Sequence, residues 1–241
     1  MFVWLLGTLL VVLGVLFVGA LPGVGWYGSR IQRGPTGKAL VALTFDDGPH
    51  PETTRRVLST LAEFGAHATF FVIGEKAQRY PEVLGEILAG GHEVALHGFK
   101  HRWSYAFLRR QALRSDMLNA LAVLREQNVP APLFFRPPVG VVSPPVARVA
   151  RELGLTLVGW SVRGYDGVGW TKAEAFVRRM CGGLRPGAIA LLHDAPERGE
   201  RVPLGVSRLS LVLAEAERRG LRAVTLGELM ASQNEILAKS E

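Results

Sequence analysis

The stretch VALTFDDGPH, residues 41–50, is a short apolar run that ends at two adjacent carboxylates, Asp46 and Asp47. A run of this length that stops at Gly48-Pro49 is typical of a buried strand rather than a helix. Two like charges held side by side need a compensating cation or metal. The stretch therefore predicts a strand over residues 39–45 and a compensating group elsewhere, although Asp-Gly alone is also a common turn dipeptide.

Outward from this stretch, apolar segments of strand type alternate with amphipathic segments of helix type. Strands are expected at residues 39–45, 67–73, 93–96, 133–136, 155–162, 188–192 and 221–225. Helices are expected at 53–64, 81–89, 104–127, 143–153 and 206–219, after 171 and from 226 onward. The alternation predicts an α/β fold with a parallel sheet buried on both faces. About seven βα units favour a closed, slightly short (β/α) barrel, in which catalytic residues gather at the carboxyl ends of the strands.

Two histidines follow the third expected strand. His97 and His101 are four residues apart, so both imidazoles can reach one cation. With a carboxylate from the first strand they would form the open three-ligand arrangement of a catalytic metal. The alternative is a surface pair or two hydrogen-bonded structural histidines, and the neighbouring pair of aspartates makes that alternative less favourable.

Further polar residues follow later strands. His193 is either a hydrogen-bonded structural histidine or a candidate general acid, with Asp166 or Asp194 available to select its tautomer. Arg136 is either a buried structural cation or the partner that keeps an aspartate ionised. All of these side chains fall at one predicted rim of the barrel, which favours the functional interpretation.

Composition limits the possible classes of protein. The chain has 241 residues, 48% hydrophobic and 20% charged, which suits one domain with an appendage. Its net charge of +7 favours an anionic surface such as a cell-wall polymer or phospholipid headgroups. The basic residues are scattered in pairs on expected helix faces, and this pattern argues against a nucleic-acid partner. The single cysteine, Cys181, excludes a disulfide within the chain.

The N-terminal segment has the length and composition of a membrane span. No charge occurs from Phe2 to Leu21, and about 20 apolar residues cross a bilayer as a helix. A cleaved signal has a shorter apolar core of about 7–15 residues and a basic start, so an uncleaved single-pass anchor is favoured. Because Arg30, Arg33 and Lys38 follow the segment and no basic residue precedes it, the positive-inside rule places the body in the cytoplasm.

The predicted organisation has four parts. An anchor or uncleaved signal covers residues 1–22, and a Gly-rich juxtamembrane linker covers 23–37. The catalytic domain covers 38–232, and a C-terminal tail covers 233–241.

Five ordered motifs resemble those of the polysaccharide deacetylases, which are NodB-homology carbohydrate esterases. The motifs are Thr44-Phe45-Asp46-Asp47-Gly48, His97-x-x-x-His101, Arg136-x-Pro138-x-Gly140, a Trp160-Ser161 strand leading to Asp166, and Leu191-x-His193. The resemblance covers residues 39–225. It implies a distorted (β/α) barrel with one divalent metal, commonly zinc, with Co²⁺, Ni²⁺ or Mn²⁺ as alternatives. It also implies a hydrolase of carbon–nitrogen bonds that removes acetyl groups from N-acetylated sugars.

The resemblance assigns roles position by position. It implies three metal ligands: Asp47, His97 and His101. It implies that Asp46 is the general base and that Arg136 is the cation that tethers this base. It also implies that His193 is the general acid and that Asp166 is the carboxylate that tunes its pKa. It implies two substrate contacts, a backbone N–H at the oxyanion and a pocket for the acetyl methyl: Val139 and Leu191.

Four departures from the family pattern bear on the substrate. The motif after the fifth strand usually reads Asp-x-x-Asp-Trp, whereas here Arg163 replaces the first acid and Gly167 replaces the tryptophan. Val139 stands where tyrosine is usual, and Gly98 where serine or threonine is usual. Arg163 is therefore expected to pair with an acid of the site or to contact an anionic group of the substrate.

Three functions compete at this stage. The first is a metal-dependent deacetylase of an extracytoplasmic glycan, either peptidoglycan or a chitin-like oligosaccharide. The family resemblance implies this extracytoplasmic location of the catalytic domain, whereas the positive-inside rule implies a cytoplasmic one. The second is a deacylase of a lipid-linked sugar at the membrane surface, which would account for the anchor and the basic charge. The third is an inactive glycan-binding member. The complete set of metal and acid–base residues argues against this third function.

Overall fold

The computed structural model describes residues 29–167, 169–196 and 201–238. The predicted membrane anchor at 1–22 lies outside these residues. Within the described part of the chain, every helix is too short or too polar to span a bilayer.

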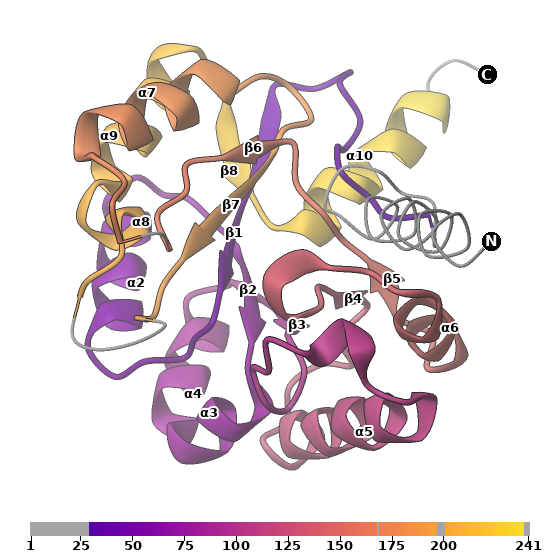
Figure 1. The fold of residues 1–241 in the computed structure, drawn as a ribbon. Coiled ribbons are helices and arrows are strands. Elements are labelled where there is room, and N and C mark those ends of the chain that lie inside the picture. Colours follow the sequence, from indigo (N-terminus) through magenta and orange to yellow (C-terminus); the bar gives the residue numbers. More distant parts are fainter. Residues whose placement is uncertain (1–28, 168, 197–200, 239–241) are drawn as a thin grey trace, which may run out of the picture.

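A parallel sheet centred on β1 (Leu40–Asp46) forms the middle of the molecule (Figure 1). The other described strands are β2 Thr69–Val72, β3 Glu93–Leu96, β4 Phe134–Phe135, β5 Thr156–Leu157, β6 Val162–Arg163, β7 Ile189–His193 and β8 Arg222–Val224. They lie in the order β5-β4-β3-β2-β1-β7-β6, and β8 pairs with the first residues of β1. All residues of β1 are buried, as expected for a central parallel strand.

Helices surround the sheet (Figure 1). They are α2 Thr53–Glu63, α3 Gly74–Arg79, α4 Pro81–Ala89, α5 Arg110–Glu126, α6 Pro144–Glu152, α7 Ala173–Gly183, α8 Leu204–Ser207, α9 Leu209–Arg218 and α10 Leu226–Ala238. Two 3₁₀ turns, η1 Tyr105–Phe107 and η2 Pro138–Gly140, lie among them. The predicted alternation of strands and helices is confirmed, and α3 is an addition that the sequence pattern did not predict.

The side chains of β1 alternate between two apolar cores. Positions 41, 43 and 45 belong to the larger core, together with the outer helices. Leu40 and Ala42 belong to a smaller cluster with Leu226 and Leu229 of α10. Because successive strand residues point to opposite faces, the carboxylate of Asp46 faces the same side as Leu40 and Ala42. The smaller cluster thus forms an apolar layer on the face of the sheet that carries the polar site.

The sheet curls into a half-barrel that is open between β5 and β6, so the expectation of a closed barrel is corrected. Residues 155–162, predicted as one strand, form β5 and β6 at opposite ends of the sheet. Between them the backbone pairs with the N-terminal segment instead: Ile31 N donates to Leu157 O, and Gly159 N donates to Ile31 O. A Cβ on Gly159 would lie 3.2 Å from Cγ of Gln32. Val158 N still donates to Phe135 O and Ser161 N to Ile189 O, so the chain leaves the strand ladder only at residues 159–160.

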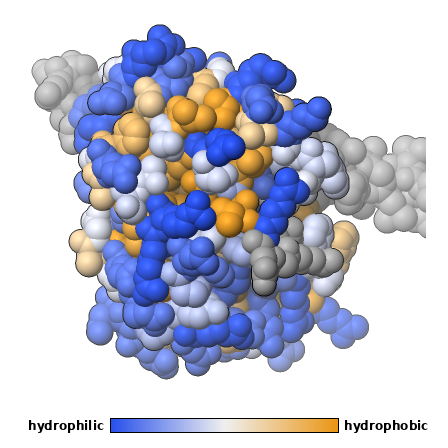
Figure 2. All heavy atoms as spheres, turned by 90° about the vertical axis from the view of Figure 1, so that its left-hand side faces the viewer, coloured by the Kyte–Doolittle hydropathy of each residue, from blue (hydrophilic) through white to orange (hydrophobic). Residues whose placement is uncertain are grey.

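The outer helix faces carry ion pairs between arginines and acids. Arg218 at the end of α9 and the following residue Arg219 both contact Glu215, and Arg55 of α2 contacts Glu86 of α4. Figure 2 shows the side of the molecule that lies on the left in Figure 1, where hydrophilic side chains surround a smaller apolar area. Exposed ion pairs of this kind contribute little to stability because solvent screens them, so the fold depends on the two cores.

Candidate active site

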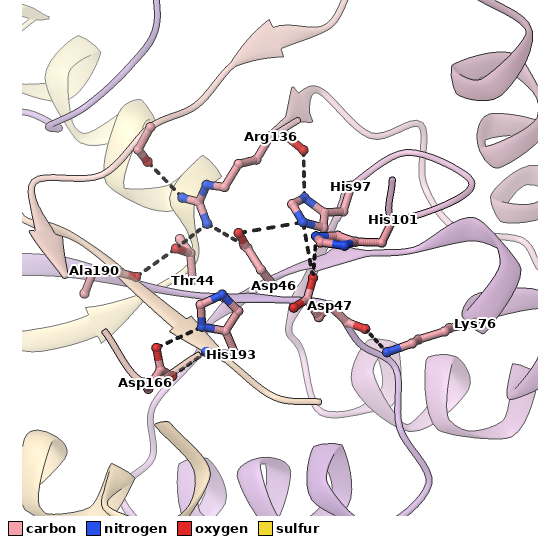
Figure 3. Close-up of polar contacts among 11 residues, drawn as sticks. Thr44, Asp46, Asp47, Lys76, His97, His101, Arg136, Asp166, Ala190 and His193 are labelled. Carbon is pink, nitrogen blue, oxygen red and sulfur yellow. Dashed lines mark hydrogen bonds and ion pairs between the residues drawn. The ribbon is translucent and has the colours of Figure 1, made fainter. Parts of the chain in front are cut away.

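The site lies where the carboxyl ends of β1 and β7 meet (Figure 3). The register of the two strands places Asp46 beside His193 and Thr44 beside Leu191. Both strands are continuous apolar runs that end in a polar residue. The register aligns the two ends, so the two polar residues lie side by side. A cavity of about 200 Å³ opens there.

The cavity gathers most of the residues that the sequence predicted for the site. Asp46, Asp47, His97, His101, Val139, Arg163, Leu191 and His193 line it. The two remaining predicted residues lie behind this lining: Arg136 contacts Asp46, and Asp166 contacts His193. The structure thus brings all ten positions to one end of the sheet.

Asp47, His97 and His101 converge on one point. Oδ1 of Asp47 lies 3.4 Å from Nε2 of His97 and 3.3 Å from Nε2 of His101. One ligand atom from each residue lies within 4.8 Å of the other two. The positive φ of Asp47, 78°, turns the chain sharply after β1, and Lys76 donates a hydrogen bond from Nζ to the Asp47 carbonyl oxygen at 2.7 Å.

The protonation pattern of this cluster fits a divalent cation. Nδ1 of His97 lies 2.7 Å from the carbonyl oxygen of Arg136, and a carbonyl only accepts, so Nδ1 is the donor and Nε2, which faces Asp47, is the nitrogen left to bind a cation. Oδ1 of Asp47 is buried and accepts no hydrogen bond from the described residues. Burial lowers the pKa of His101 despite the nearby Asp47 charge, so this imidazole also offers a lone pair. Two nitrogens and one carboxylate oxygen are the donor set of a catalytic zinc site.

The carboxyl of Asp47 is held ionised within this cluster. Burial by itself raises its pKa. Contact with His97 and the positive charge of His193 outweigh the burial and lower the pKa of Asp47 well below its usual range. An ionised carboxylate is the form that binds a cation.

Arg136 is fully buried and holds Asp46 by one oxygen. Its Nη1 donates to Oδ1 of Asp46 at 2.6 Å and to Oγ1 of Thr44 at 2.9 Å, and its Nη2 donates to the Gly159 carbonyl at 2.8 Å. The guanidinium also stacks 4.1 Å above the ring of Phe71. The other oxygen of Asp46, Oδ2, lies 4.0 Å from Nε2 of His97. The carboxylate is therefore fixed at one oxygen and presents the other beside the metal-ligand cluster.

His193 is paired with Asp166 and not with Asp194. Asp166 accepts from Nδ1 and from the backbone N–H of His193, each at 2.8 Å. Asp194 instead accepts from the hydroxyl of Thr54 beneath the Gly48 turn. Burial lowers the pKa of His193, but the charge and hydrogen bond of Asp166, with the charges of Asp47 and Asp46, outweigh it and raise the pKa to about 10. His193 is a cation at neutral pH.

Val139 adopts a backbone conformation that its residue type rarely takes. Its φ of 62° and ψ of −4° lie in the left-handed region, which is a genuine outlier for a β-branched residue. Such conformations persist where the surrounding structure imposes them, and they cluster at functional sites. Here the strained residue lines the cavity, with its side chain 40% exposed.

Two residues of the site were not predicted from the sequence. Thr44 donates to the Ala190 carbonyl at 2.7 Å while it accepts from Arg136. Lys76 supports the backbone of Asp47 from the unpredicted helix α3 (Figure 3). The two-residue alternation along β1 could have placed Thr44 on the same face as Asp46, whereas no local pattern marks Lys76.

The chain matches known proteins over most of its length. The sequence model of the family described as polysaccharide deacetylase matches residues 33–158. A peptidoglycan-N-acetylglucosamine deacetylase of Bacillus cereus is 35% identical over 198 residues, which cover 81% of this chain and 90% of the relative. A chitooligosaccharide deacetylase of Sinorhizobium fredii is 39% identical over 171 residues, covering 70% of this chain and 78% of the relative.

Two solved structures share the fold at similar identities. The Bc1960 peptidoglycan N-acetylglucosamine deacetylase superposes with a TM-score of 0.76 at 31% identity, covering 83% of this chain and 92% of that one. A family 4 acetyl xylan esterase from Clostridium thermocellum, solved with a cobalt ion, has a TM-score of 0.73 at 30% identity, covering 81% and 92%.

Proposed function

The chain belongs to the polysaccharide deacetylase family of hydrolases, and we propose from this premise that it removes N-acetyl groups from an amino-sugar glycan, peptidoglycan or a chitin-like oligosaccharide. One observation carries the proposal. A carboxylate held by Arg136 and an imidazolium held by Asp166 face one cavity, with the Asp47, His97 and His101 cluster beside them. This arrangement supplies a base and an acid beside one cation site.

Asp47, His97 and His101 would hold one divalent metal, with zinc favoured and cobalt, nickel or manganese as alternatives. The bound metal would act as a Lewis acid toward the acetamide carbonyl and would acidify a water molecule.

Asp46 serves as the general base. Its Oδ1 is engaged by Arg136, and its Oδ2 is the oxygen on the side of the ligand cluster. A base that is held at one oxygen keeps the other in a constant position, and this oxygen accepts the proton of the attacking water. The buried guanidinium keeps a compensating positive charge beside the carboxylate before the proton arrives.

His193 serves as the general acid. The expelled amine is a poor leaving group unless its nitrogen is protonated. With a pKa raised to about 10, His193 carries that proton at neutral pH, and Asp166 holds Nδ1 so that Nε2 is left to donate it. Asp166 therefore sets both the charge and the orientation of the acid.

The remaining contacts position the acetyl group. The strained turn at Val139 orients its backbone N–H for the oxyanion that forms on the carbonyl oxygen. Leu191, buried at the base of the cavity between Thr44 and Arg163 in the sheet register, offers the apolar surface for the methyl group.

Acetate release tests the proposal directly. The purified protein is mixed with acetylated chitooligosaccharides and with peptidoglycan fragments, with zinc, cobalt or nickel added in turn. Metal-dependent acetate release is expected, and Asp46→Asn should abolish it while the bound metal is retained. Absence of acetate release with every substrate and metal would refute the deacetylase proposal and favour a glycan-binding member.

We also propose that residues 1–22 anchor the protein in a membrane with the catalytic domain on the extracytoplasmic side. The uncharged stretch from Phe2 to Leu21 supports the anchor, and the named activity of the peptidoglycan-directed relatives supports the side. The basic residues at 30, 33 and 38 favour the opposite side. A reporter of compartment fused after Glu241 decides between the two, and a cytoplasmic signal would refute the proposed orientation.

A further inference from the structure

Arg163 is a permanent cation on the cavity wall with no acid partner among the described residues. It occupies the end of β6, where the register places it beside Leu191 of β7. It lines the same cavity as Asp46 and His193. Unlike Arg136, it makes no hydrogen bond or ion pair to another described side chain, and its contacts are with aromatic rings.

Two aromatic rings lie beside the Arg163 guanidinium. Its Cζ lies 4.4 Å from the ring centre of Tyr165 and 5.5 Å from that of Trp160. A guanidinium stacked on rings keeps its N–H donors in its own plane, where they are open to a planar acceptor. Cζ of Arg179, on α7, lies 5.4 Å from the ring centre of the same Tyr165. This arginine adds a second positive charge.

The backbone under this cluster is closely packed and hydrogen-bonded. A Cβ on Gly164 would lie 2.3 Å from Cδ2 of Phe176, so the segment after β6 packs tightly on α7. Tyr165 has a φ of 63°, in the left-handed region, which costs energy for a bulky residue. Asp166 then anchors the segment through two hydrogen bonds to His193. The arginine is therefore presented from a fixed platform that is connected to the general acid.

We propose that Arg163, stacked on Tyr165 and Trp160, binds an oxyanion carried by the glycan next to the acetamide that is hydrolysed. The substrate class is thus an acidic N-acetylated sugar, in which a carboxylate or phosphate accepts paired hydrogen bonds from the guanidinium. Asp46 and Asp47 would repel such a group from the cavity, and the uncompensated charge of Arg163 offsets this repulsion. The inference rests on the proposed deacetylase function and narrows it.

Matched substrates test the inference with the full-length protein. One is an oligosaccharide of alternating N-acetylglucosamine and N-acetylmuramic acid with free carboxylates. A second is the same oligosaccharide with these carboxylates converted to methyl amides, which removes the charge and keeps the shape. A third is an N-acetylglucosamine phosphate. A preference for the first identifies a carboxylate, and a preference for the third identifies a phosphate such as that of a lipid-linked sugar.

Substitutions at two arginines separate local recognition from the overall charge. Arg163→Met should lower kcat/KM for the preferred anionic substrate about tenfold more than for the methyl amide, mainly through KM, because hydrogen bonds to charged groups are lost in the ground state. Arg163→Lys should restore part of the preference. Arg178→Met removes the same charge from the exposed surface of α7 and should leave the preference intact.

Several results would overturn the inference. Equal turnover of the anionic and methyl amide substrates by the wild type would do so, and so would equal losses in Arg163→Met and Arg178→Met. If the wild type releases no acetate at all, the proposed function fails and calorimetric binding of N-acetylmuramic acid decides the inference separately. Weaker binding in Arg163→Met would support anion recognition, and unchanged binding would refute it.

Discussion

Nη1 of Arg136 lies 2.6 Å from Oδ1 of Asp46 in a position where the arginine side chain has no solvent exposure. The two residues come from β1 and from the end of β4, ninety positions apart in the sequence. Their pairing connects the stability of the half-barrel to the chemistry of the site, since each partner would be a buried unpaired charge without the other.

Removal of the guanidinium should therefore destabilise the fold strongly. Arg136→Met leaves the Asp46 carboxylate buried without its partner, and the expected loss is about 3–5 kcal/mol in the free energy of unfolding. The double variant Asp46→Asn/Arg136→Met should recover part of that loss because the orphaned charge is gone. Denaturant unfolding of the wild type, the single variants Asp46→Asn and Arg136→Met, and the double variant measures the coupling between the two residues. Additive effects on the free energy of unfolding would contradict a direct pair.

The His193–Asp166 pair predicts the alkaline limb of the pH–rate profile. The folded pKa of His193, raised to about 10, lies above the ordinary value of about 6.5. Its stabilising contribution is therefore fully present below about pH 6.5 and is lost as the pH rises through about 10. Acetate release, which needs the imidazolium, should likewise fall as the pH rises through about 10.

Asp166→Asn tests this assignment, because it removes the carboxylate charge that contributes most to the raised pKa of His193. The alkaline limb of kcat/KM should move to lower pH, and kcat at neutral pH should fall. A profile that keeps its alkaline limb in place would show that His193 is not the group observed. Asp194→Asn provides a control with an adjacent carboxylate that does not contact the imidazole.

Asp194 predicts a second pH effect, on stability alone. Burial, helped by the charge of Asp47, raises the pKa of Asp194 to about 6. The hydrogen bond from Thr54 and the charge of Lys76 act in the opposite direction and only partly offset this rise. A raised carboxyl pKa gives stability that is present below about pH 4 and is lost as the pH rises through about 6. Between pH 4 and pH 7, the free energy of unfolding of Asp194→Asn should therefore rise by about 2 kcal/mol relative to that of the wild type. A stability difference that is constant with pH would contradict this.

Metal content tests the ligand cluster without reference to turnover. Elemental analysis of the purified protein should find about one divalent ion per chain, as a single three-ligand site requires. His97→Ala and Asp47→Ala should lose it. His67→Gln, a substitution of an exposed histidine far from the cluster in sequence, should retain it. Unchanged metal content in His97→Ala would refute the ligand assignment.

Local sequence pattern was sufficient for much of the fold. Strand β1 was predicted over 39–45 and is observed over Leu40–Asp46, and the strand at 93–96 agrees residue for residue. Apolar runs that end in polar rim residues carry this information because they must be buried whatever the rest of the chain does. The sequence also implied ten site positions, and the structure places all of them at one end of the sheet.

The errors arise where distant segments compete for the same backbone. The strand expected at 155–162 splits because Ile31 takes the hydrogen bonds of Leu157 and Gly159. Lys76 reaches the carbonyl of Asp47 from helix α3, a contact that no periodicity indicates. Both are pairings between residues that are remote in sequence, and local pattern contains no record of them.

The primary structure alone specifies which chemical groups stand at the strand ends, because apolar periodicity and motif order are local properties of the chain. The local pattern left open whether Asp166 or Asp194 would orient His193, a choice that only the family resemblance made, and whether Arg163 would meet an acid or an anionic group of the substrate. Packing resolves both questions: Asp194 is buried under the Gly48 turn against Thr54, and Arg163 stacks on Tyr165 and Trp160. The partner of a charged side chain depends on which backbones approach in three dimensions, and that follows from the curvature of the sheet and the close packing at glycines.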